Sequence, residues 1–433
     1  MTIATAQAIT TAQTMTAARA AQLRWARAPL ARRLKMIREL RGLIAENASR
    51  LAEASACARQ RPAQESLTAE VFPLAESCRF LERNAGRILA PRRLGRRGRP
   101  LWLSGVHSRI HREPLGVILI IGPGNYPLFL PGVQLIQALA AGNAVLLKPG
   151  IGGGPAAHAL VELVIRAGFD RQLVALLPES VDAARTAIIA RPDKVLVTGS
   201  AATGRNIMAQ LAPHLIPSVM ELSGSDAVII RADADLALAA KAIAFARNLN
   251  GGATCMSPAR VFVAAARSAE FERLFARALR ESHGGLSVVP VSSDEQAVSL
   301  ANDSPFGLAA SIYSRDESAA RLLSERINAG VVTINDTIIP TADARTPFGG
   351  RGRSGFGATR GAEGLLELTT AKVVTVSRGR FRPAFDAPVA GDEALFTLYL
   401  TMAHARGFTS RVAAFVALIP RLARRPTPRQ DDT

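Results

Sequence analysis

Cysteine is scarce in this chain of 433 residues, which contains three, at positions 57, 78 and 255. They form no closely spaced pair and no even-numbered set, so the sequence excludes a disulfide scaffold and a zinc ribbon. We therefore predict no metal site. Free cysteines fit a reducing compartment, and we expect a cytoplasmic protein.

Long hydrophobic runs and aromatic residues are also lacking. No apolar run approaches the ~20 residues of a membrane-spanning helix. Residues 1–18 are rich in Thr, Ala and Gln and lack the apolar stretch of a signal peptide, and we expect residues 1–16 to form a disordered tail. Aromatic residues make up 5% of the chain, which leaves few side chains for stacking on nucleic-acid bases.

Acidic residues are too few to balance the basic ones, and the net charge is +18. The excess lies mainly in residues 1–112, which contain 21 Lys and Arg against 7 Asp and Glu, whereas residues 113–379 contain 24 against 23. Such a surface could meet nucleic acid, an anionic membrane or an acidic partner. Because no nucleic-acid-binding motif accompanies the charge, we favour solvated helix faces and expect no nucleic-acid partner.

The hydrophobic pattern changes along the chain. Residues 17–90 have helical periodicity, and from residue 117 short apolar strands alternate with helices. This alternation predicts an α/β fold with parallel, doubly wound sheets, in which ligands bind at the carboxyl ends of the strands. The expected strands are 117–121, 144–148, 174–177, 194–197, 227–230, 261–263, 287–291, 309–313 and 331–334.

The last part of the chain, residues 380–433, reads as a basic helical extension. A basic amphipathic helix can lie on a membrane, which would make the protein peripherally membrane-associated, or it can pack on its own domain or on a neighbouring subunit. We prefer packing, because Gly407 and Pro420 interrupt the apolar stripe.

Four side chains at strand ends or in glycine-rich loops could carry chemistry. The Cys255 thiolate could attack a carbonyl, Glu221 could activate a water molecule, and the Asn125 amide could donate to a developing oxyanion. Lys148 could reach a phosphate or a ribose. Taken singly, such residues are more often ordinary core, surface or turn residues.

A phosphate-binding turn is a further candidate. Thr198-Gly199-Ser200 follows a strand, and a helix begins near Gly204. Backbone N–H groups at a helix N-terminus favour an anion. The turn does not match the Gly-x-Gly-x-x-Gly fingerprint of dinucleotide-binding folds.

The candidate residues and the stretches around them, taken together and in their order along the chain, resemble the aldehyde dehydrogenase superfamily over residues 20–378. The separations from Asn125 to Lys148 and from Glu221 to Cys255 agree with the family pattern. The matching stretches are HREPLGV (111–117), GPGNYP (122–127), AGNAVLLKP (141–149), VTGSAATGR (197–205), MELSGSDA (220–227), GGATC (251–255), NDSPFGLAASIYSRD (302–316), VTIND (332–336) and PFGGRGRSGFG (347–357).

The resemblance implies a Rossmann-type dinucleotide-binding domain, an α/β catalytic domain and a small β bridging element. We expect these at 17–226 (with a bridging segment near 106–113), at 227–358, and at 365–378, before the extension at 380–433. The short bridging strands of the family imply a homodimer or a homotetramer.

The resemblance also implies a reaction. Cys255 would add to an aldehyde to form a thiohemiacetal, with Asn125 and the Cys255 N–H holding the oxyanion. Hydride transfer to NAD or NADP would leave a thioester, which Glu221 would hydrolyse by activating water. The resemblance implies that Tyr126 and Phe348 line the substrate pocket. The implied cofactor-binding residues are Lys148, Gly199, Ser200, Gly204, Leu222 and Glu281.

The sequence departs from the family pattern at several points. Ile151 stands where the family has a ribose-binding Glu, Gly124 replaces an aromatic residue, and Ala253 replaces Gln. Several dozen residues are also missing between 263 and 286, including a Glu-x-Phe-Gly-Pro motif whose role Glu281 could inherit. The shortening allows a second reading, a non-catalytic protein on this fold. A coenzyme A-acylating enzyme is a third, less favoured because Glu221 is present.

Overall fold

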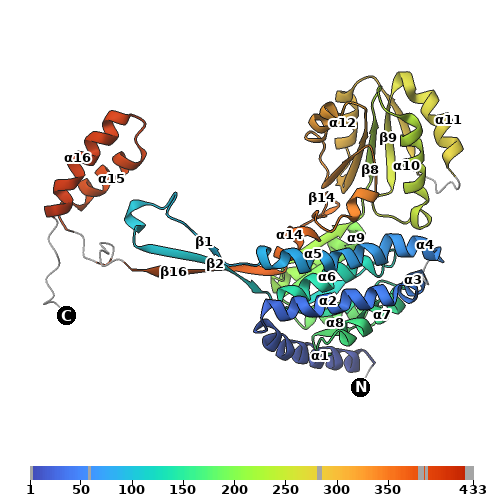
Figure 1. The fold of residues 1–433 in the computed structure, drawn as a ribbon, viewed down its shortest axis with the longest axis horizontal. Coiled ribbons are helices and arrows are strands. Elements are labelled where there is room, and N and C mark those ends of the chain that lie inside the picture. The colour runs from blue at the N-terminus through green and yellow to red at the C-terminus, as the bar shows by residue number, and fades with distance from the viewer. Residues whose placement is uncertain (1–2, 57–59, 280–284, 379–384, 386–388, 425–433) are drawn as a thin grey trace. The chain divides into compact units, whose positions relative to one another are not determined.

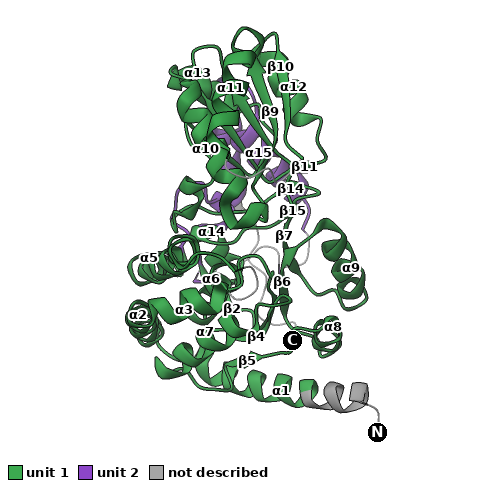
Figure 2. Ribbon diagram, turned by 90° about the vertical axis from the view of Figure 1, so that its right-hand side faces the viewer, with its two compact units in different colours: residues 1–92, 110–373 green, residues 93–109, 374–433 purple. Residues whose placement is uncertain are grey.

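The structure, a computed structural model, describes residues 3–56, 60–279, 285–378, 385 and 389–424. Within these residues the chain divides into two compact units. Unit 1 comprises residues 1–92 and 110–373, and unit 2 comprises residues 93–109 and 374–433 (Figure 2).

The first sheet of unit 1 has six strands in the order β15-β7-β6-β3-β4-β5. Its strands pair in parallel, except that the short β15 runs antiparallel to β7. All residues of the central strands β3 and β4 are buried, as expected for a sheet covered on both faces. The strands are β3 (Val117–Ile121), β4 (Ala144–Lys148), β5 (Val174–Leu176), β6 (Lys194–Gly199), β7 (Ser218–Leu222) and β15 (Gly355–Phe356).

Helices cover both faces of this sheet (Figure 2). Helices α8 (Val181–Ile189) and α9 (Ala201–Leu211) lie on one side, and α5 (Phe72–Ile88), α6 (Phe129–Ala141) and α7 (Gly154–Arg166) on the other. Both α8 and α9 begin at a serine, Ser180 or Ser200, whose side chain accepts a hydrogen bond from the backbone N–H three residues on. Such N-caps satisfy a donor that the helix itself leaves free.

The N-terminal segment corrects one prediction. The expected tail at 1–16 is wrong, because helix α1 (Ile3–Ala26) occupies it from Ile3 onward. Met15 and Trp25 are buried in the core of the first sheet, and Arg19 forms an ion pair of 2.7 Å with Asp193. Tertiary contacts therefore hold a helix whose Ala- and Thr-rich sequence shows little helical periodicity. Between α1 and α5 lie α2 (Leu30–Glu46), α3 (Ala48–Ala56), α4 (Ala63–Ser66) and a π-helical turn (Leu67–Val71).

The second sheet of unit 1 has five parallel strands in the order β10-β9-β8-β12-β13. Helices α10 and α11 lie on one face and α12 on the other (Figure 1). Alternate residues of β8 belong to separate hydrophobic clusters, Ile229 to one and Val228 and Ile230 to the other. The elements are β8 (Asp226–Ile230), α10 (Leu236–Asn248), β9 (Pro258–Ala264), α11 (Ser268–Ala278), β10 (Ser287–Val291), α12 (Asp294–Asn302), β12 (Ala309–Tyr313), α13 (Glu317–Ser324) and β13 (Val331–Ile334).

The two sheets confirm the predicted parallel α/β architecture, and each predicted strand is present within one to three residues of its expected ends. The boundary predicted after residue 226 falls one residue into the second sheet, since β7 ends at Leu222 and β8 begins at Asp226. One segment crosses that boundary. Strand β15 lies within the range assigned to the second domain but pairs with β7 of the first sheet.

Unit 2 contains the C-terminal helices α15 (Asp392–His404) and α16 (Phe408–Arg424). A three-stranded sheet has the order β1 (Arg92–Arg93), β2 (Val106–Pro114), β16 (Thr369–Ser377), and each of its strands β2 and β16 contains residues assigned to both units. Strands β2 and β16 occupy the two segments predicted to bridge. No helix among the described residues is long and apolar enough to cross a membrane.

Candidate active site

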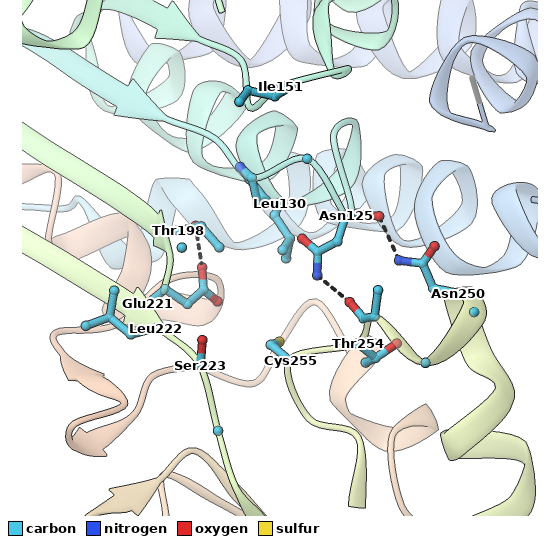
Figure 3. A pocket seen from close by; sticks show the side chains of 17 residues that line it. Asn125, Leu130, Ile151, Thr198, Glu221, Leu222, Ser223, Asn250, Thr254 and Cys255 are labelled. Atoms are coloured by element: carbon cyan, nitrogen blue, oxygen red, sulfur yellow. Dashed lines mark hydrogen bonds between the residues drawn. The ribbon is translucent and has the colours of Figure 1, made fainter. Parts of the chain in front are cut away.

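A cavity of about 920 Å³ opens at the carboxyl ends of β3, β6 and β7. This is the edge at which parallel sheets bind ligands. The loop between α10 and β9 forms its opposite wall (Figure 3). Its lining residues are Pro123, Gly124, Asn125, Leu130, Ile151, Thr198, Gly199, Glu221, Leu222, Ser223, Gly224 and 250–255.

Cys255 lies on this loop, whose path depends on three successive residues with left-handed backbone. Asn250, Gly251 and Gly252 have φ values of 56°, 57° and 76°. Asn250 is buried, and hydrogen bonds fix it, because its N–H donates to Glu65 Oε1 at 2.7 Å and its Nδ2 donates to the Asn125 carbonyl at 2.8 Å. These bonds offset the conformational cost of a non-glycine residue at positive φ and turn Cys255 toward the cavity.

Asn125 follows β3 and faces the same loop. Its Nδ2 donates a hydrogen bond to the Ala253 carbonyl at 2.8 Å (Figure 3). An amide nitrogen carries two hydrogens, so a second donor remains after this bond is made. The side chain is thereby held against the backbone two residues before Cys255.

Glu221 lies on β7 and is buried, with 4% of its surface exposed. Its carboxylate accepts hydrogen bonds from Thr198 Oγ1 at 3.1 Å, Thr359 Oγ1 at 3.2 Å and Gln134 Nε2 at 3.4 Å. Burial raises the pKa of Glu221, while the charge of Arg360 and these hydrogen bonds act against the rise. A buried carboxyl group with a raised pKa is suited to take and release protons near neutral pH.

Arg360 is the cationic group that faces both reactive side chains. It is 3% exposed, its Nη1 donates to the Thr341 carbonyl, and its guanidinium lies over the rings of Phe348 and Phe129 at 4.5 and 5.6 Å. Burial, together with nearby carboxylates, raises the pKa of the Cys255 thiol to about 12, and the charge of Arg360 opposes this rise.

A second cavity of about 390 Å³ shares Cys255 with the first and is lined mainly by apolar side chains. Tyr126 and Phe348, both predicted for the substrate pocket, line it. The Tyr126 hydroxyl is 2.6 Å from Thr254 Oγ1, which fixes the ring beside Cys255. Thus Cys255 lies between a larger polar cavity and a smaller apolar one.

The predicted dinucleotide residues are grouped at the carboxyl ends of β4, β6 and β7. Gly199 and Leu222 line the larger cavity. Lys148 ends β4, and Ser200 caps helix α9. A Cβ atom at Gly204 would lie 2.7 Å from Leu222 Cδ1, so only glycine lets the start of α9 approach β7 this closely. The size of the cavity, the turn before α9 and Lys148 together fit a dinucleotide.

The comparisons with known proteins agree with this geometry. The model of the aldehyde dehydrogenase family matches residues 1–285 and 286–374. The chain belongs to the aldehyde dehydrogenase family. The match divides between residues 285 and 286, within the interval where we expected a missing segment. Sheet pairing nevertheless continues across this interval, since β10 pairs with β9 over five residues.

Curated relatives cover most of the chain. A Methylomonas protein named 4,4'-diapolycopene aldehyde oxidase is 30% identical over 424 residues, 82% of this chain and 80% of its own. A Mycolicibacterium smegmatis protein provisionally named succinate-semialdehyde dehydrogenase [NADP(+)] is 28% identical and covers 83% of each chain. Family membership supports aldehyde oxidation in general and makes the chain an oxidoreductase.

Solved structures share the aldehyde dehydrogenase fold. A P. syringae indole-3-acetaldehyde dehydrogenase in complex with NAD+ and IAA superposes with a TM-score of 0.79, at 22% identity, over 86% of this chain and 89% of that one. A Mycobacterium tuberculosis aldehyde dehydrogenase with NAD+ gives 0.78 at 23% identity, over 85% and 90%. The predicted fold class is therefore confirmed.

The structure shows the surroundings of two residues that depart from the family pattern, Gly124 and Ile151. Gly124 passes so close to the loop after β4 that a Cβ atom there would lie 2.6 Å from the Ile151 carbonyl oxygen, which leaves no room for an aromatic side chain. Ile151 itself is 79% exposed and lines the larger cavity. Glu281 lies outside the described residues.

Sequence reasoning missed three residues of this aldehyde dehydrogenase site, and it assigned Thr198 only to a phosphate-binding turn. Thr198, Thr359 and Gln134 bind Glu221, and Arg360 supplies the nearby charge. Thr198 and Gln134 precede Glu221 by 23 and 87 residues, and Thr359 follows it by 138. The sequence signal available was an arginine among small residues in the segment GATRGA.

Proposed function

We propose that the chain oxidises an apolar aldehyde to a carboxylic acid through a thioester on Cys255. The observation that carries this proposal is the position of Cys255, which lines both cavities. The larger cavity also holds Glu221 and Asn125, and the smaller one offers an apolar surface to the rest of the substrate.

In the first half of the reaction, the Cys255 sulfur adds to the aldehyde carbon. The second Asn125 amide N–H and the Cys255 backbone N–H hold the resulting oxyanion. Arg360 favours the thiolate, because its charge opposes the effect of burial on the thiol pKa. A bound nicotinamide dinucleotide supplies the hydride acceptor that leaves a thioester on the sulfur.

In the second half, Glu221 deprotonates water, and the hydroxide attacks the thioester to release the acid and the thiolate. The raised pKa of Glu221 suits this task, and hydrogen bonds from Thr198 and Thr359 orient its two oxygens separately. Glu221 also argues against the coenzyme A-acylating reading, in which water must not compete with the acyl acceptor.

NAD or NADP would lie along the carboxyl ends of β4, β6 and β7, held by Lys148, Gly199, Ser200, Gly204 and Leu222. Two of the similar structures are complexes with NAD+, and one relative is named as an NADP(+) enzyme. Ile151 offers no carboxylate to the ribose hydroxyls, and so Lys148 would make the polar contact there.

The substrate class follows from the smaller cavity. Its lining is mainly apolar and aromatic, and its one strong cation, Arg360, is already placed between two phenyl rings and next to Glu221. We therefore expect a hydrocarbon aldehyde rather than one that carries a carboxylate. The Methylomonas relative, named for the aldehyde of a polyene, fits this class.

A kinetic comparison tests the proposal. Purified protein should reduce NAD or NADP with medium-chain and long-chain unsaturated aldehydes, and should act poorly on succinate semialdehyde. Cys255→Ala should lower turnover at least about 10³-fold, whereas Cys78→Ala, which removes a thiol buried elsewhere in the core, should retain it.

Three outcomes would contradict the proposal. Activity retained by Cys255→Ala would remove the nucleophile. Acyl-coenzyme A in excess of free acid would favour the acylating reading. Failure to bind either dinucleotide in calorimetry would favour a non-catalytic protein on this fold.

Self-association would use strand β16, which is the edge of its three-stranded sheet. Val373, Val374 and Val376 are exposed on it, and an exposed apolar edge strand is a site for pairing with another chain. A homodimer or homotetramer built on this edge should dissociate when Val374→Lys is introduced, as measured by light scattering.

A further inference from the structure

Helices α15 and α16 of unit 2 pack against each other along one side only. Leu395 of α15 and Ala414 and Leu418 of α16 are buried. The Arg411 Nε also donates to the Met402 carbonyl at 3.0 Å. This packing leaves the remaining faces of both helices open within the unit.

The open face of α16 carries an apolar stripe. Apart from the adjacent pair Phe415 and Val416, its members follow one another at three- or four-residue steps, which places them on one side of a helix. Phe396 and Leu400 on α15 are exposed in the same way, at 49% and 58%. The stripe consists of Phe408 (79% exposed), Val412 (44%), Phe415 (51%), Val416 (62%), Ile419 (54%) and Leu422 (43%).

Unit 2 is also strongly basic. Its residues, 93–109 and 374–433, contain 14 Lys and Arg against 5 Asp and Glu, whereas the rest of the chain contains 39 against 30. Arg406 and Arg421 are exposed on or beside α16. Trp102, also in unit 2, is 68% exposed in a segment that contains Arg97 and Arg99. Aromatic residues beside arginines are typical of membrane–water interfaces.

We propose that the apolar stripe of α16 docks on the surface of an anionic lipid bilayer. Such a surface offers hydrocarbon to Phe408, Phe415 and Ile419 and negative charge to the surrounding arginines. A second copy of the same face would instead bring two basic units together, which like-charge repulsion opposes. Helix α16 lies on the surface rather than spanning the bilayer, because it has 17 residues and contains Pro420 and two internal arginines. This inference is independent of the reaction proposed for Cys255.

Co-sedimentation of the full-length chain with lipid vesicles tests the docking. Vesicles of phosphatidylcholine with about 30 mol% phosphatidylglycerol should bind the protein about tenfold or more better than pure phosphatidylcholine. Raising the salt concentration should weaken binding. The double variant Phe415→Asp/Ile419→Asp should lose about tenfold or more of the binding.

The matched control is Leu238→Asp/Leu322→Asp, which places the same charges at two exposed leucines of unit 1, 43% and 65% exposed. It should bind vesicles like the parent. Equal binding by the α16 variant and the parent, or no preference for anionic vesicles, would overturn the proposal. A change in oligomer mass caused by the α16 variant without any effect on vesicle binding would do the same, and would assign the stripe to a second copy of the chain.

Discussion

The two sheets of unit 1 each place one buried carboxyl group near Cys255, and the two groups have different surroundings. Glu221, at the end of β7 in the first sheet, accepts three side-chain hydrogen bonds and faces Arg360. Asp226, at the start of β8 in the second sheet, accepts one bond, from the Ala309 N–H at 3.2 Å. Its Oδ2 has no hydrogen-bond partner among the described residues.

This difference determines how many groups oppose the effect of burial on the pKa of each carboxyl group. Partners that favour the ionised form moderate the pKa of Glu221. Burial raises the pKa of Asp226 to about 8, with little to oppose it. Both carboxylates raise the pKa of Cys255 when ionised. We therefore expect the first sheet to supply the base, and Asp226 of the second sheet to be protonated at neutral pH.

The largest expected effect is that of Glu221→Gln. Glutamine fits the same hydrogen-bonding space but cannot take a proton from water, so thioester hydrolysis should slow by about 10²–10⁴-fold. Pre-steady-state kinetics should show a burst of reduced nicotinamide of up to one equivalent, followed by slow turnover. Asp226→Asn should show no such burst. Steady turnover by Glu221→Gln at the parent rate would contradict the assignment of the base.

The next largest effect concerns Arg360, whose positive charge acts on both Cys255 and Glu221. Arg360→Met should raise the pKa of Cys255 and Glu221, because the opposing charge is lost. At neutral pH, kcat/KM should fall by about 10- to 100-fold, and the activity profile should move to higher pH. Arg360→Lys keeps the charge and should restore the profile in part. A uniform loss at all pH values would instead indicate a purely structural role for Arg360.

A third effect concerns stability. In the folded protein the pKa of Asp226 is about 8, against an ordinary value of 3.8. The folded state therefore holds a proton that the unfolded state releases, and stability falls as the pH rises from about 4 to about 8. Asp226→Asn resembles the protonated acid and should remove this dependence, making the variant more stable than the parent by a few kcal/mol at pH 8 and similar at pH 4.

Thermal unfolding across this pH range measures the difference. Glu221→Gln provides a comparison, because it removes the other buried carboxyl group near Cys255, whose pKa burial also raises. Between pH 4 and pH 8, the melting temperature of the parent should fall more than that of Asp226→Asn. Equal changes in the two proteins would show that Asp226 is ionised in the folded state.

The sequence predicted the first sheet and the second with similar success, because buried parallel strands are short apolar runs bounded by glycine, as in β3 and β4. It also indicated Cys255, Glu221 and Asn125 as reactive groups, which the structure brings to one cavity. It could not reveal Arg360, whose importance depends on the packing of Phe129 and Phe348 around it. Helix α1 was missed for a related reason, since distant partners such as Asp193 stabilise it.

The smallest expected effect concerns coenzyme preference and a third carboxylate, Glu179, which follows the edge strand β5 of the first sheet. Glu179 accepts hydrogen bonds from the N–H groups of Gly152 and Gly154, at 2.7 and 2.6 Å, beside Lys148 and at the start of α7. It already supplies the negative charge that a helix N-terminus favours, and should repel a 2′-phosphate in the neighbouring ribose site. We therefore predict that NAD is preferred to NADP.

Glu179→Gln should shift the ratio of kcat/KM values toward NADP by about three- to tenfold, because a factor of ten corresponds to about 1.4 kcal/mol. Glu162→Gln, on the exposed side of α7, should leave the ratio unchanged, which controls for the general loss of negative charge. An unchanged ratio in Glu179→Gln would place the 2′-phosphate away from the α7 N-terminus. The contrast with Asp226 would then remain, because each carboxylate oxygen of Glu179 accepts a hydrogen bond from a backbone N–H, whereas Oδ2 of Asp226 has no partner among the described residues.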